Sequence, residues 1–308
     1  MSVFAIVAPG QGSQTPGMLR TWLEDPALAD LVASFGEAAG LDLVELGTTA
    51  DAATITDTSN AQPLIVTAAL VSATALFGGL PVKPPRVVAG HSVGELSALA
   101  VAGVLGGAEA VALAARRGAG MAKAAAAVPS GMSAVVGGRR EDVLAAIGDA
   151  GCVAANVNSA GQVVAAGTPE QLAHLADNPP ARARVIPLQV AGAFHTVHMA
   201  PAQATFADDV ARLTPSDPSV TLLSNRDGSE VTDGADAVAR LVTQLTSPVR
   251  WDLCMATMTN LGVTAIIELA PGGVLTGLAK REMKGVPAVA ISSPADLDDA
   301  RELMEQTA

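Results

Sequence analysis

The hydrophobic pattern alternates between short continuous apolar runs and longer stretches with apolar residues at helical spacing. The first run, Ser2 to Ala8, predicts a strand buried on both faces, because a half-exposed strand would alternate apolar and polar residues. Residues 26–39, 61–77 and 108–127 have the spacing of helices, and a second apolar run, residues 87–89, lies between the last two. Strands that alternate with helices predict a parallel α/β sheet with helices on both faces.

The pattern changes after residue 129. The expected elements there are strands at 132–136, 153–157, 162–166 and 184–190, and helices at 140–150 and 168–176. Their order, β-α-β-β-α-β, is the ferredoxin-like pattern. We therefore expect an α/β protein with two parts: a large α/β-hydrolase-like domain with a parallel sheet, residues 1–129 and 192–308, and an inserted ferredoxin-like subdomain, residues 130–191.

Composition and charge exclude several classes of protein. Half of the 308 residues are apolar and 16% are charged, which supports a large core and excludes wholesale disorder. A net charge of −12 argues against nucleic-acid binding. The most apolar stretch, Pro63 to Leu80, is interpreted as a buried amphipathic helix, not a membrane span. Cys152 and Cys254 lie far apart without metal-ligand spacing, so we expect core thiols in a reduced, cytoplasmic protein.

A candidate nucleophile lies where the second apolar run meets a helix. The sequence Gly90-His91-Ser92-Val93-Gly94 has the form G-x-S-x-G, which holds a serine exposed on a sharp strand-to-helix turn. The small residues permit the tight backbone, and the helix N-terminus offers N–H groups to an oxyanion. The alternative is a purely structural Gly-Ser-Gly turn. The flanking strand and helix favour the nucleophile.

A serine needs a base, and the chain has four histidines. His195 and His198 lie where the chain leaves the predicted insert, and a cleft is expected at such a junction. We favour His195, since His198 opens the next helix. His91 is expected to support the turn, and His174 to be solvated on a helix. No Asp or Glu is singled out as a third member, which favours a Ser-His dyad with an oxygen acceptor at Nδ1.

Two further residues have both a functional and a structural interpretation. Arg117 lies in an alanine-rich helix, where it is either a carboxylate-binding guanidinium in an acyl pocket or a surface arginine beside Arg116. Gln11 lies in the glycine-rich loop after the first strand. It is a turn residue unless that loop faces Ser92, which is plausible because loops at the carboxyl ends of parallel strands share the ligand side of a sheet.

Taken together, these motifs resemble the malonyl-CoA:acyl carrier protein transacylases of bacterial type II fatty acid synthesis. The resemblance spans nearly the whole chain and is far more specific than G-x-S-x-G alone. It rests on Pro9–Gln14, Ala61–Pro63, Gly90–Glu95, Arg117–Gly118, Asn156–Ser159 with Gly161–Gln162, Ala193–His195, Gln244–Leu245 with Pro248–Trp251, and Leu269–Leu278.

The resemblance implies a ping-pong acyl transfer. Ser92 would attack malonyl-CoA and carry the malonyl group, with His195 as base and then as acid to the leaving thiol. The backbone amides of Gln11 and Val93 would form the oxyanion hole. The main-chain carbonyl of Gln244 would hold His195. The second substrate would be the phosphopantetheine thiol of acyl carrier protein, so the enzyme itself would need no cofactor and no metal.

The resemblance also implies how the substrate is selected. Arg117 would pair with the malonyl carboxylate, and Asn158 and Gln162 would line the cleft between the domains. Phe194, in the sequence Ala-Phe-His, is similar to the malonyl-type pattern of polyketide acyltransferase domains, so we expect malonyl to be preferred over methylmalonyl. Comparable methylmalonyl transfer would contradict this expectation.

Several points remain open at the level of sequence. The alternatives are a malonyl transferase of another pathway, polyketide synthesis or malonate decarboxylase, and an acyl-CoA thioesterase or lipase-like hydrolase with a triad carboxylate. A binding module without catalysis would lack Ser92 or His195, and both are present. We expect a monomer. An acidic carrier would dock on a local basic patch, either residues 280–284 or Arg182 with Arg184.

Overall fold

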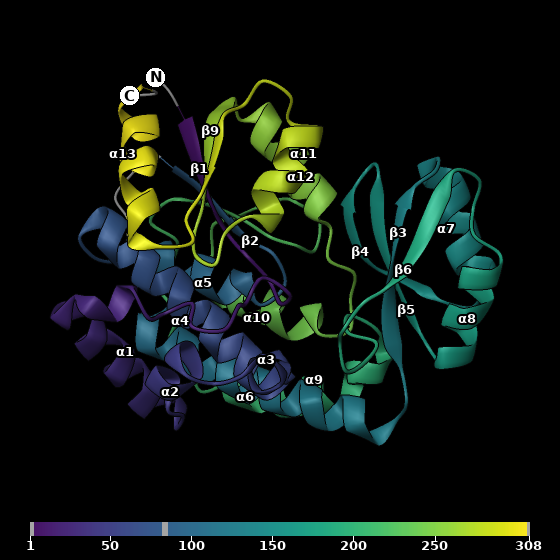
Figure 1. The fold of residues 1–308 in the computed structure, drawn as a ribbon, viewed down its shortest axis with the longest axis horizontal. Coiled ribbons are helices and arrows are strands. Elements are labelled where there is room, and N and C mark those ends of the chain that lie inside the picture. Colours follow the sequence, from purple (N-terminus) through teal and green to yellow (C-terminus); the bar gives the residue numbers. More distant parts are fainter. Residues whose placement is uncertain (1–2, 82–85, 307–308) are drawn as a thin grey trace.

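The larger of two sheets is mostly parallel. The computed structural model describes residues 3–81 and 86–306, and Figure 1 shows its arrangement. The strand order is β10-β9-β1-β2-β7-β8. Neighbours pair in parallel except β7 and β8, which are antiparallel. The strands are β1 (Val3–Ala8), β2 (Arg86–Gly90), β7 (Thr221–Leu223), β8 (Glu230–Val231), β9 (Val263–Glu268) and β10 (Ala288–Ala290).

Helices cover both faces of this sheet. Phe4 and Ile6 of β1 pack into the core beside α4, α5 and α6, whereas Ala5 and Val7 face the core beside α11 and α12. This alternation explains why the sequence of β1 is apolar throughout. The helices of this part are α1 (Pro26–Ala39), α2 (Leu43–Thr48), α3 (Ala52–Thr56), α4 (Thr58–Phe77), α5 (Gly94–Val101), α6 (Gly107–Ala127), α9 (Ala200–Val210), α10 (Gly234–Gln244), α11 (Trp251–Asn260), α12 (Val274–Glu282) and α13 (Leu297–Gln306).

The smaller sheet has the strand order β4-β5-β3-β6, and all its neighbours are antiparallel. With two helices this is the ferredoxin-like arrangement, so the predicted fold class is confirmed. Its elements are β3 (Gly131–Gly137), α7 (Arg140–Asp149), β4 (Val153–Ser159), β5 (Gln162–Gly167), α8 (Pro169–Asp177) and β6 (Ala183–Pro187). The division into domains at residues 129/130 and 191/192 stays a proposal.

Some predicted elements differ from the structure. The polar segment at residues 47–58, for which no helix was expected, contains α3, because Asp51 caps that short helix by accepting from Thr54 N at 2.8 Å. The strand expected at 184–190 ends at Pro187. Helix α13 was not predicted. By length and composition α4 could cross a membrane, but it is buried along most of its length inside the fold, on all sides and not on one amphipathic face.

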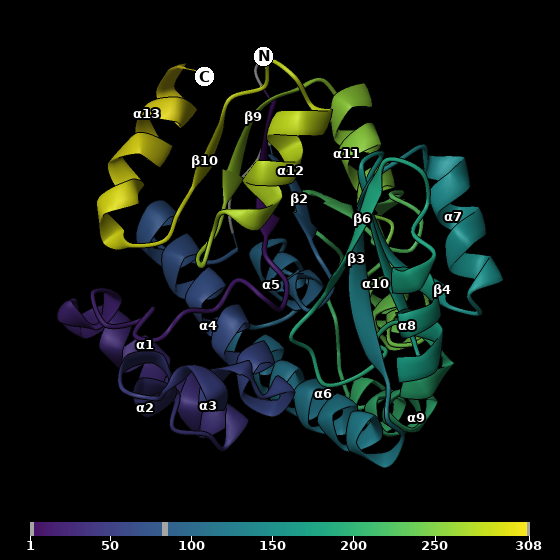
Figure 2. The ribbon, with the colours of Figure 1, turned by 45° about the vertical axis from the view of Figure 1, so that its right-hand side comes forward.

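The two sheets are joined side by side. Val157 N of β4 donates to Val249 O at 2.8 Å, and Val249 N donates to Ala155 O at 2.9 Å. Next to this bridge Arg140 of α7 pairs with Asp252 of α11 at 2.6 Å. Helices α11 and α12 therefore lie between the sheets, as Figure 2 shows. The carboxyl ends of β1 and β2 face the smaller sheet across a cleft.

Candidate active site

Glycines allow the turn at Ser92. A Cβ on Gly90 would lie 1.9 Å from Gly94 O, and a Cβ on Gly94 would lie 2.3 Å from Ala8 O, so neither position accepts a side chain. Ser92 itself has φ 53, in the left-handed region that L-residues rarely adopt. The sequence therefore folds into a strained elbow between β2 and α5, as its G-x-S-x-G pattern predicts.

Asn225 holds the elbow from the neighbouring strand. It follows β7, which pairs with β2, and its Oδ1 accepts from Ser92 N at 2.7 Å while its Nδ2 donates to Gly90 O at 2.6 Å. These bonds satisfy the backbone polar groups that the sharp turn leaves without ladder partners. Sequence reasoning missed Asn225. A polar residue directly after a buried strand was the available signal.

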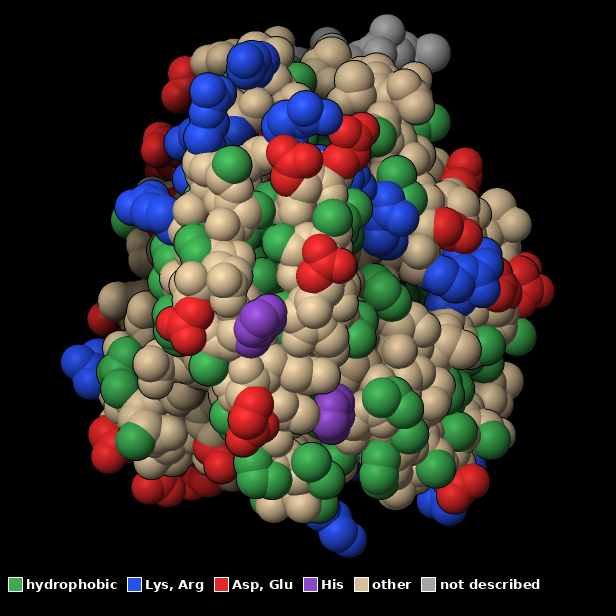
Figure 3. All heavy atoms as spheres, turned by 90° about the vertical axis from the view of Figure 1, so that its right-hand side faces the viewer, with side chains coloured by type: hydrophobic (Ala, Val, Ile, Leu, Met, Phe, Trp, Pro, Cys, Tyr) green, Lys and Arg blue, Asp and Glu red, His purple; other side chains and the backbone are tan. Residues whose placement is uncertain are grey.

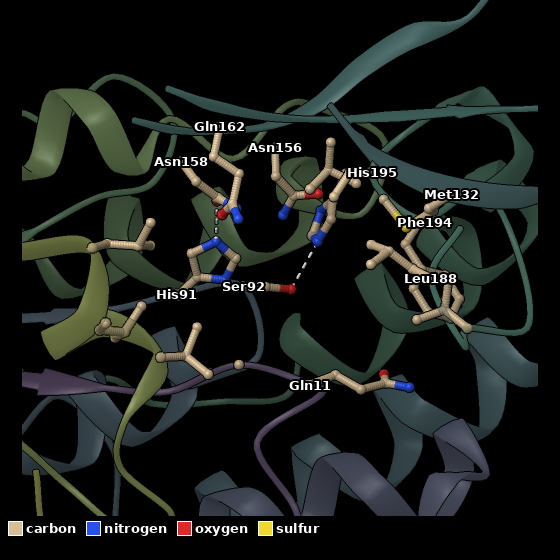
Figure 4. A pocket seen from close by; sticks show the side chains of 17 residues that line it. Gln11, His91, Ser92, Met132, Asn156, Asn158, Gln162, Leu188, Phe194 and His195 are labelled. Carbon is tan, nitrogen blue, oxygen red and sulfur yellow. Dashed lines mark hydrogen bonds between the residues drawn. The ribbon is translucent and has the colours of Figure 1, made fainter. Parts of the chain in front are cut away.

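Ser92 and His195 are hydrogen-bonded to each other. The Ser92 Oγ lies 2.7 Å from His195 Nε2 (Figure 4). On the other side of the ring, His195 Nδ1 lies 2.8 Å from the main-chain O of Gln244. A carbonyl only accepts, so Nδ1 carries the proton and Nε2 is free to accept from the serine. The group that orients His195 is therefore a main-chain carbonyl and not a carboxylate, as expected for a Ser-His dyad.

His195 is neutral in this environment. Burial and the nearby charge of Arg117 lower its pKa to about 3, against an ordinary value of 6.5. His198 lies in the following 3-10 turn and is half-buried, and His174 is exposed on α8. Of the candidate histidines, the structure brings His195 to the serine.

Arg117 is buried beside the serine. It is 1% exposed, which rules out the surface alternative. Its Nη1 donates to Gln62 Oε1 at 2.6 Å and its Nη2 to Gln244 Oε1 at 2.7 Å, and Nη2 also lies 3.4 Å from Ser92 Oγ. Burial lowers its pKa to about 10, so it remains a cation at neutral pH. Gln62, within the Ala61–Pro63 motif, had been given no role.

A buried carboxylate lies under the same network. Glu95 is 4% exposed, and its oxygens accept from Asn225 N and from Gln244 Nε2, both at 2.5 Å. Burial raises its pKa to about 7, although its hydrogen bonds and the Arg117 charge act in the opposite direction. Sequence analysis included Glu95 in the elbow motif without assigning it a function.

The cleft has walls from both sheets, as Figure 4 shows. Asn158 of β4 accepts a hydrogen bond from His91 Nε2 at its Oδ1, at 2.8 Å, and its Nδ2 donates to Gln162 Oε1 at 2.9 Å. His91 thus links the elbow to the smaller sheet. Oδ1 can only accept, so His91 Nε2 is the donor. Asn158 and Gln162 do line the cleft, as expected.

Gln11, Val93 and Phe194 are also at the cleft or next to it. The loop after β1 brings Gln11 to the cleft, with its side-chain amide donating to Thr58 Oγ1 at 3.3 Å and not to Ser92. Val93 follows Ser92 and is the N-cap residue of α5. Phe194 is 5% exposed and lines the cleft next to His195.

In the described part of the chain, the cysteines and acidic groups form no cluster of the kind that holds a metal ion. Cys152 and Cys254 are both free and buried, as predicted for core thiols. Within residues 3–81 and 86–306, no three His, Cys, Asp or Glu side chains come together in a way that could hold a metal ion.

The comparisons with known proteins agree with each other. A family model described as acyl transferase domain matches residues 5–298. The malonyl CoA-acyl carrier protein transacylase of Mycobacterium tuberculosis is 55% identical over 302 residues, which cover 98% of this chain and 100% of the relative.

Two solved structures have the same fold. The crystal structure of MCAT from Mycobacterium tuberculosis has a TM-score of 0.91 at 55% identity and covers 96% of this chain and 99% of that one. A malonyl-transacylase in complex with its type II PKS acyl-carrier protein has a TM-score of 0.90 at 32% identity and covers 98% of this chain and 99% of that one.

The α/β fold with an inserted ferredoxin-like sheet, and a serine, a histidine and an arginine at one cleft, define an acyltransferase. Within that class, the chain belongs to the malonyl CoA-acyl carrier protein transacylase family.

Proposed function

We propose that this chain transfers a malonyl group from malonyl-CoA to the phosphopantetheine thiol of acyl carrier protein, for fatty acid biosynthesis. The observation that carries the proposal is the buried Arg117 cation, whose Nη2 lies 3.4 Å from the Ser92 hydroxyl. A fixed guanidinium beside a nucleophile selects an acyl group that ends in a carboxylate. Its Nε is buried and has no hydrogen-bond partner among the residues that the structure describes, so the group keeps donor capacity for a ligand.

The first half-reaction forms an ester on Ser92. His195 Nε2 takes the proton of Ser92 Oγ as that oxygen attacks the thioester carbonyl. The backbone N–H groups of Gln11 and Val93 are the proposed donors to the oxyanion. Collapse breaks the carbon–sulfur bond, and the CoA sulfur leaves with the proton that His195 held. The thioester supplies the activation, and the exchange calls on no cofactor.

The second half-reaction reverses these roles. The carrier thiol gives its proton to His195 and attacks the malonyl ester, and the Ser92 oxygen takes that proton back as it leaves. The Gln244 carbonyl keeps Nδ1 protonated throughout, so Nε2 alone exchanges protons. A histidine with a pKa near 3 is neutral at neutral pH, so its Nε2 is free to accept, and once protonated it gives the proton readily to the leaving group.

The cleft residues set the fit of the acyl group. We assign Asn158 and Gln162 to the wall of the substrate cleft, and Phe194 to the side that would meet a 2-methyl branch. The ring of Phe194 therefore favours malonyl over methylmalonyl. The free, buried cysteines fit an enzyme that works in the reducing cytoplasm.

Two rival functions can be distinguished, one by the partner of the catalytic histidine and the other by the acyl carrier protein. A hydrolase with a Ser-His-Asp triad is disfavoured because His195 Nδ1 meets the Gln244 carbonyl. A malonyl transferase for another pathway would use the same cleft, and the acyl carrier protein that it serves would distinguish it. One of the structural relatives is named in complex with a type II PKS carrier.

Docking of the acidic carrier needs a local basic patch on an acidic protein. Figure 3 shows the face of the smaller sheet, where most Lys and Arg side chains gather in the upper half and Asp and Glu are spread over the surface. Lys280 and Arg281 in the last turn of α12, together with Lys284, remain one proposed contact, and Arg182 with Arg184 the other. Charge reversal at Lys280 and Arg281 that left carrier affinity unchanged would remove the first.

The test is acyl-group selectivity. Malonyl and acetyl transfer from CoA to holo acyl carrier protein are measured by mass spectrometry for the wild type and for Arg117→Ala. Loss of a buried guanidinium–carboxylate pair costs about 2–5 kcal/mol, so the malonyl preference should fall roughly 30- to 5000-fold while Ser92 is still acylated.

Arg116→Ala is the matched control, because Arg116 is the adjacent arginine but is half-exposed and pairs with Asp209. This variant should keep the wild-type preference. Hydrolysis of both acyl-CoAs by the wild type, without transfer to the carrier, would show a thioesterase and contradict the proposed function.

A further inference from the structure

The buried site holds one cation and one carboxylate that do not touch. Arg117 Nη2 donates to Gln244 Oε1 at 2.7 Å, and Gln244 Nε2 donates to Glu95 Oε2 at 2.5 Å. The side-chain amide of Gln244 therefore connects the two charges: its oxygen faces the cation and its NH2 group faces the carboxylate. A buried charge without a counter-charge is strongly unfavourable, so Arg117 and Glu95 compensate each other in the free protein.

A malonyl carboxylate changes this balance. When it pairs with Arg117, two negative charges surround one buried positive charge. The malonyl carboxylate would contact Arg117 directly, whereas Glu95 reaches Arg117 only through Gln244, so Glu95 would lose more of its compensation. A like charge nearby favours the neutral form of a carboxyl group.

Glu95 also lines a small cavity among α5, β7, β8 and α10. The cavity holds about 10 Å³, close to the size of one water, and Glu95, Ser224 and Arg240 are its polar lining. None of its lining residues lines the substrate cleft. Arg240 reaches the surface, where it pairs with Asp227 and Asp236. We infer that a solvent proton reaches Glu95 by way of this cavity and not through the substrate cleft.

We propose that Glu95 is the ionisable counter-charge of Arg117, ionised in the free enzyme and protonated by one solvent proton while the malonyl group occupies the site. The inference rests on the proposed function. In the acylation step Ser92 and malonyl-CoA give the ester and CoA thiol, and Glu95 takes one further proton from solvent. When the carrier removes the malonyl group, Glu95 returns that proton. The buried site then keeps one positive and one negative charge throughout the cycle.

Glu95 is suited to this exchange at neutral pH, since its pKa is about 7. The other groups that face this region do not change charge in that range. Arg117 has a pKa of about 10, and that of His195 is about 3. Burial raises the pKa of the Cys254 thiol far above neutrality. Arg240, from α10, forms ion pairs with Asp227 and Asp236.

Linkage fixes the sign of the pH effect. Because malonyl binding favours protonated Glu95, protonated Glu95 in turn favours malonyl binding. The malonyl-to-acetyl preference of the wild type should be greatest below pH 7 and decrease above it. A shift of about one pKa unit gives roughly a five- to tenfold fall between about pH 6 and pH 8.5. The carrier thiol and His195 serve both acyl groups, so their titration cancels in this ratio.

The direct test is proton uptake on malonylation. The intact enzyme is mixed with malonyl-CoA in weak buffer with a pH indicator, and the protons taken up are divided by the Ser92 malonylated. At about pH 7.5 we expect roughly half a proton or more per site for the wild type and none for Glu95→Gln. Acetyl-CoA, which brings no carboxylate, should give no uptake once Ser92 is acetylated.

Glu268→Gln is the matched control. Glu268 is also a fully buried carboxylate, but it accepts from Gly273, Leu275 and Thr276 N–H groups, and none of these partners is charged. The Glu268→Gln variant should therefore take up as many protons per malonylated Ser92 as the wild type. If Glu95→Gln does not fold, the pH dependence of the wild-type preference still tests the inference.

The outcomes separate the two proposals. A wild type that forms no malonyl-Ser92 contradicts the proposed function. A wild type that is malonylated without proton uptake, or with a preference that does not change with pH, overturns the role of Glu95 alone. Equal uptake by the wild type and Glu95→Gln overturns it as well.

Discussion

At the scale of single residues, the site is a set of side chains whose protonation is fixed by their neighbours. His195 meets a carbonyl at Nδ1, which leaves Nε2 as the acceptor for Ser92. Because His195 is buried beside Arg117, it stays neutral at pH values where an ordinary histidine would be protonated. The same arginine attracts the substrate carboxylate and prevents the histidine from being protonated too early.

This arrangement predicts an unusual pH profile for acylation. The rate of Ser92 acetylation by acetyl-CoA should stay level from about pH 7 to about pH 5, where an ordinary histidine would already be mostly protonated. Acetyl-CoA is used because it has no carboxylate to engage Arg117. In Arg117→Ala the acid limb should move to higher pH, since a positive charge next to His195 is removed. A wild-type rate that is halved near pH 6.5 would contradict this account.

At the scale of elements, the elbow depends on the close contact of α5 with β1 and β2. Gly94 begins α5 directly above the carboxyl end of β1, where Ala8 O and Pro9 O leave no space for a methyl group. Asn225, at the end of β7, ties the turn to a third strand. The serine is therefore positioned by three neighbouring parallel strands and not by its own loop.

A methyl group at Gly94 should disturb this contact. Gly94→Ala is expected to lower the free energy of unfolding by about 1–3 kcal/mol and to reduce Ser92 acylation, because α5 must move away from β1. Gly277→Ala in α12 is the control: within residues 3–81 and 86–306, no atom outside the local helix backbone lies within 4 Å of its added Cβ, so helix propensity should raise stability by about 0.5–1 kcal/mol. Chemical denaturation of both variants measures the free energy of unfolding, and their acylation rates measure the effect on Ser92. A stable, fully active Gly94→Ala would show that the contact is not needed.

At the scale of the whole molecule, the cleft exists because two sheets are held at a fixed distance. The backbone bridge between β4 and residue 249 is reinforced by Asp252, whose Oδ2 accepts from Arg140 at 2.6 Å and from Arg250 at 3.0 Å. Burial alone would raise the pKa of Asp252, but these hydrogen bonds lower it below its usual range. The stabilisation is present above the ordinary aspartate pKa of 3.8 and is lost as pH falls below it.

Removal of the Asp252 charge should weaken the contact between the two sheets. Asp252→Asn is expected to cost about 1–3 kcal/mol of stability at neutral pH, toward the lower end because Arg140 is partly exposed. Amide hydrogen exchange in β4 should become faster. Glu141→Gln, which breaks an exposed ion pair with Arg139 on α7, should change neither quantity. Equal effects of the two substitutions would mean that the Asp252 pairs do not hold the sheets together.

The sequence alone determined the local features of this protein. Apolar runs and helical spacing gave most of the elements and the fold class, since these patterns report which faces are buried. The G-x-S-x-G motif gave Ser92, because its glycines are required by the backbone of the turn itself. Position at the domain junction selected His195 and His198, and His195 was favoured because His198 opens the next helix. Short elements such as α3, and the C-terminal helix α13, were missed.

Only the tertiary structure decided which distant side chains meet. Arg117 could be a surface residue or a buried one until α6 was placed against α4, which brought Gln62 to its guanidinium, and α10 supplied Gln244. Asn225 and Glu95 acquired their roles only from the pairing of β7 with β2 and the packing of α10 on α5. Burial and charge in this interior set the protonation of His195 and Glu95. These are long-range interactions, and a linear pattern does not contain them.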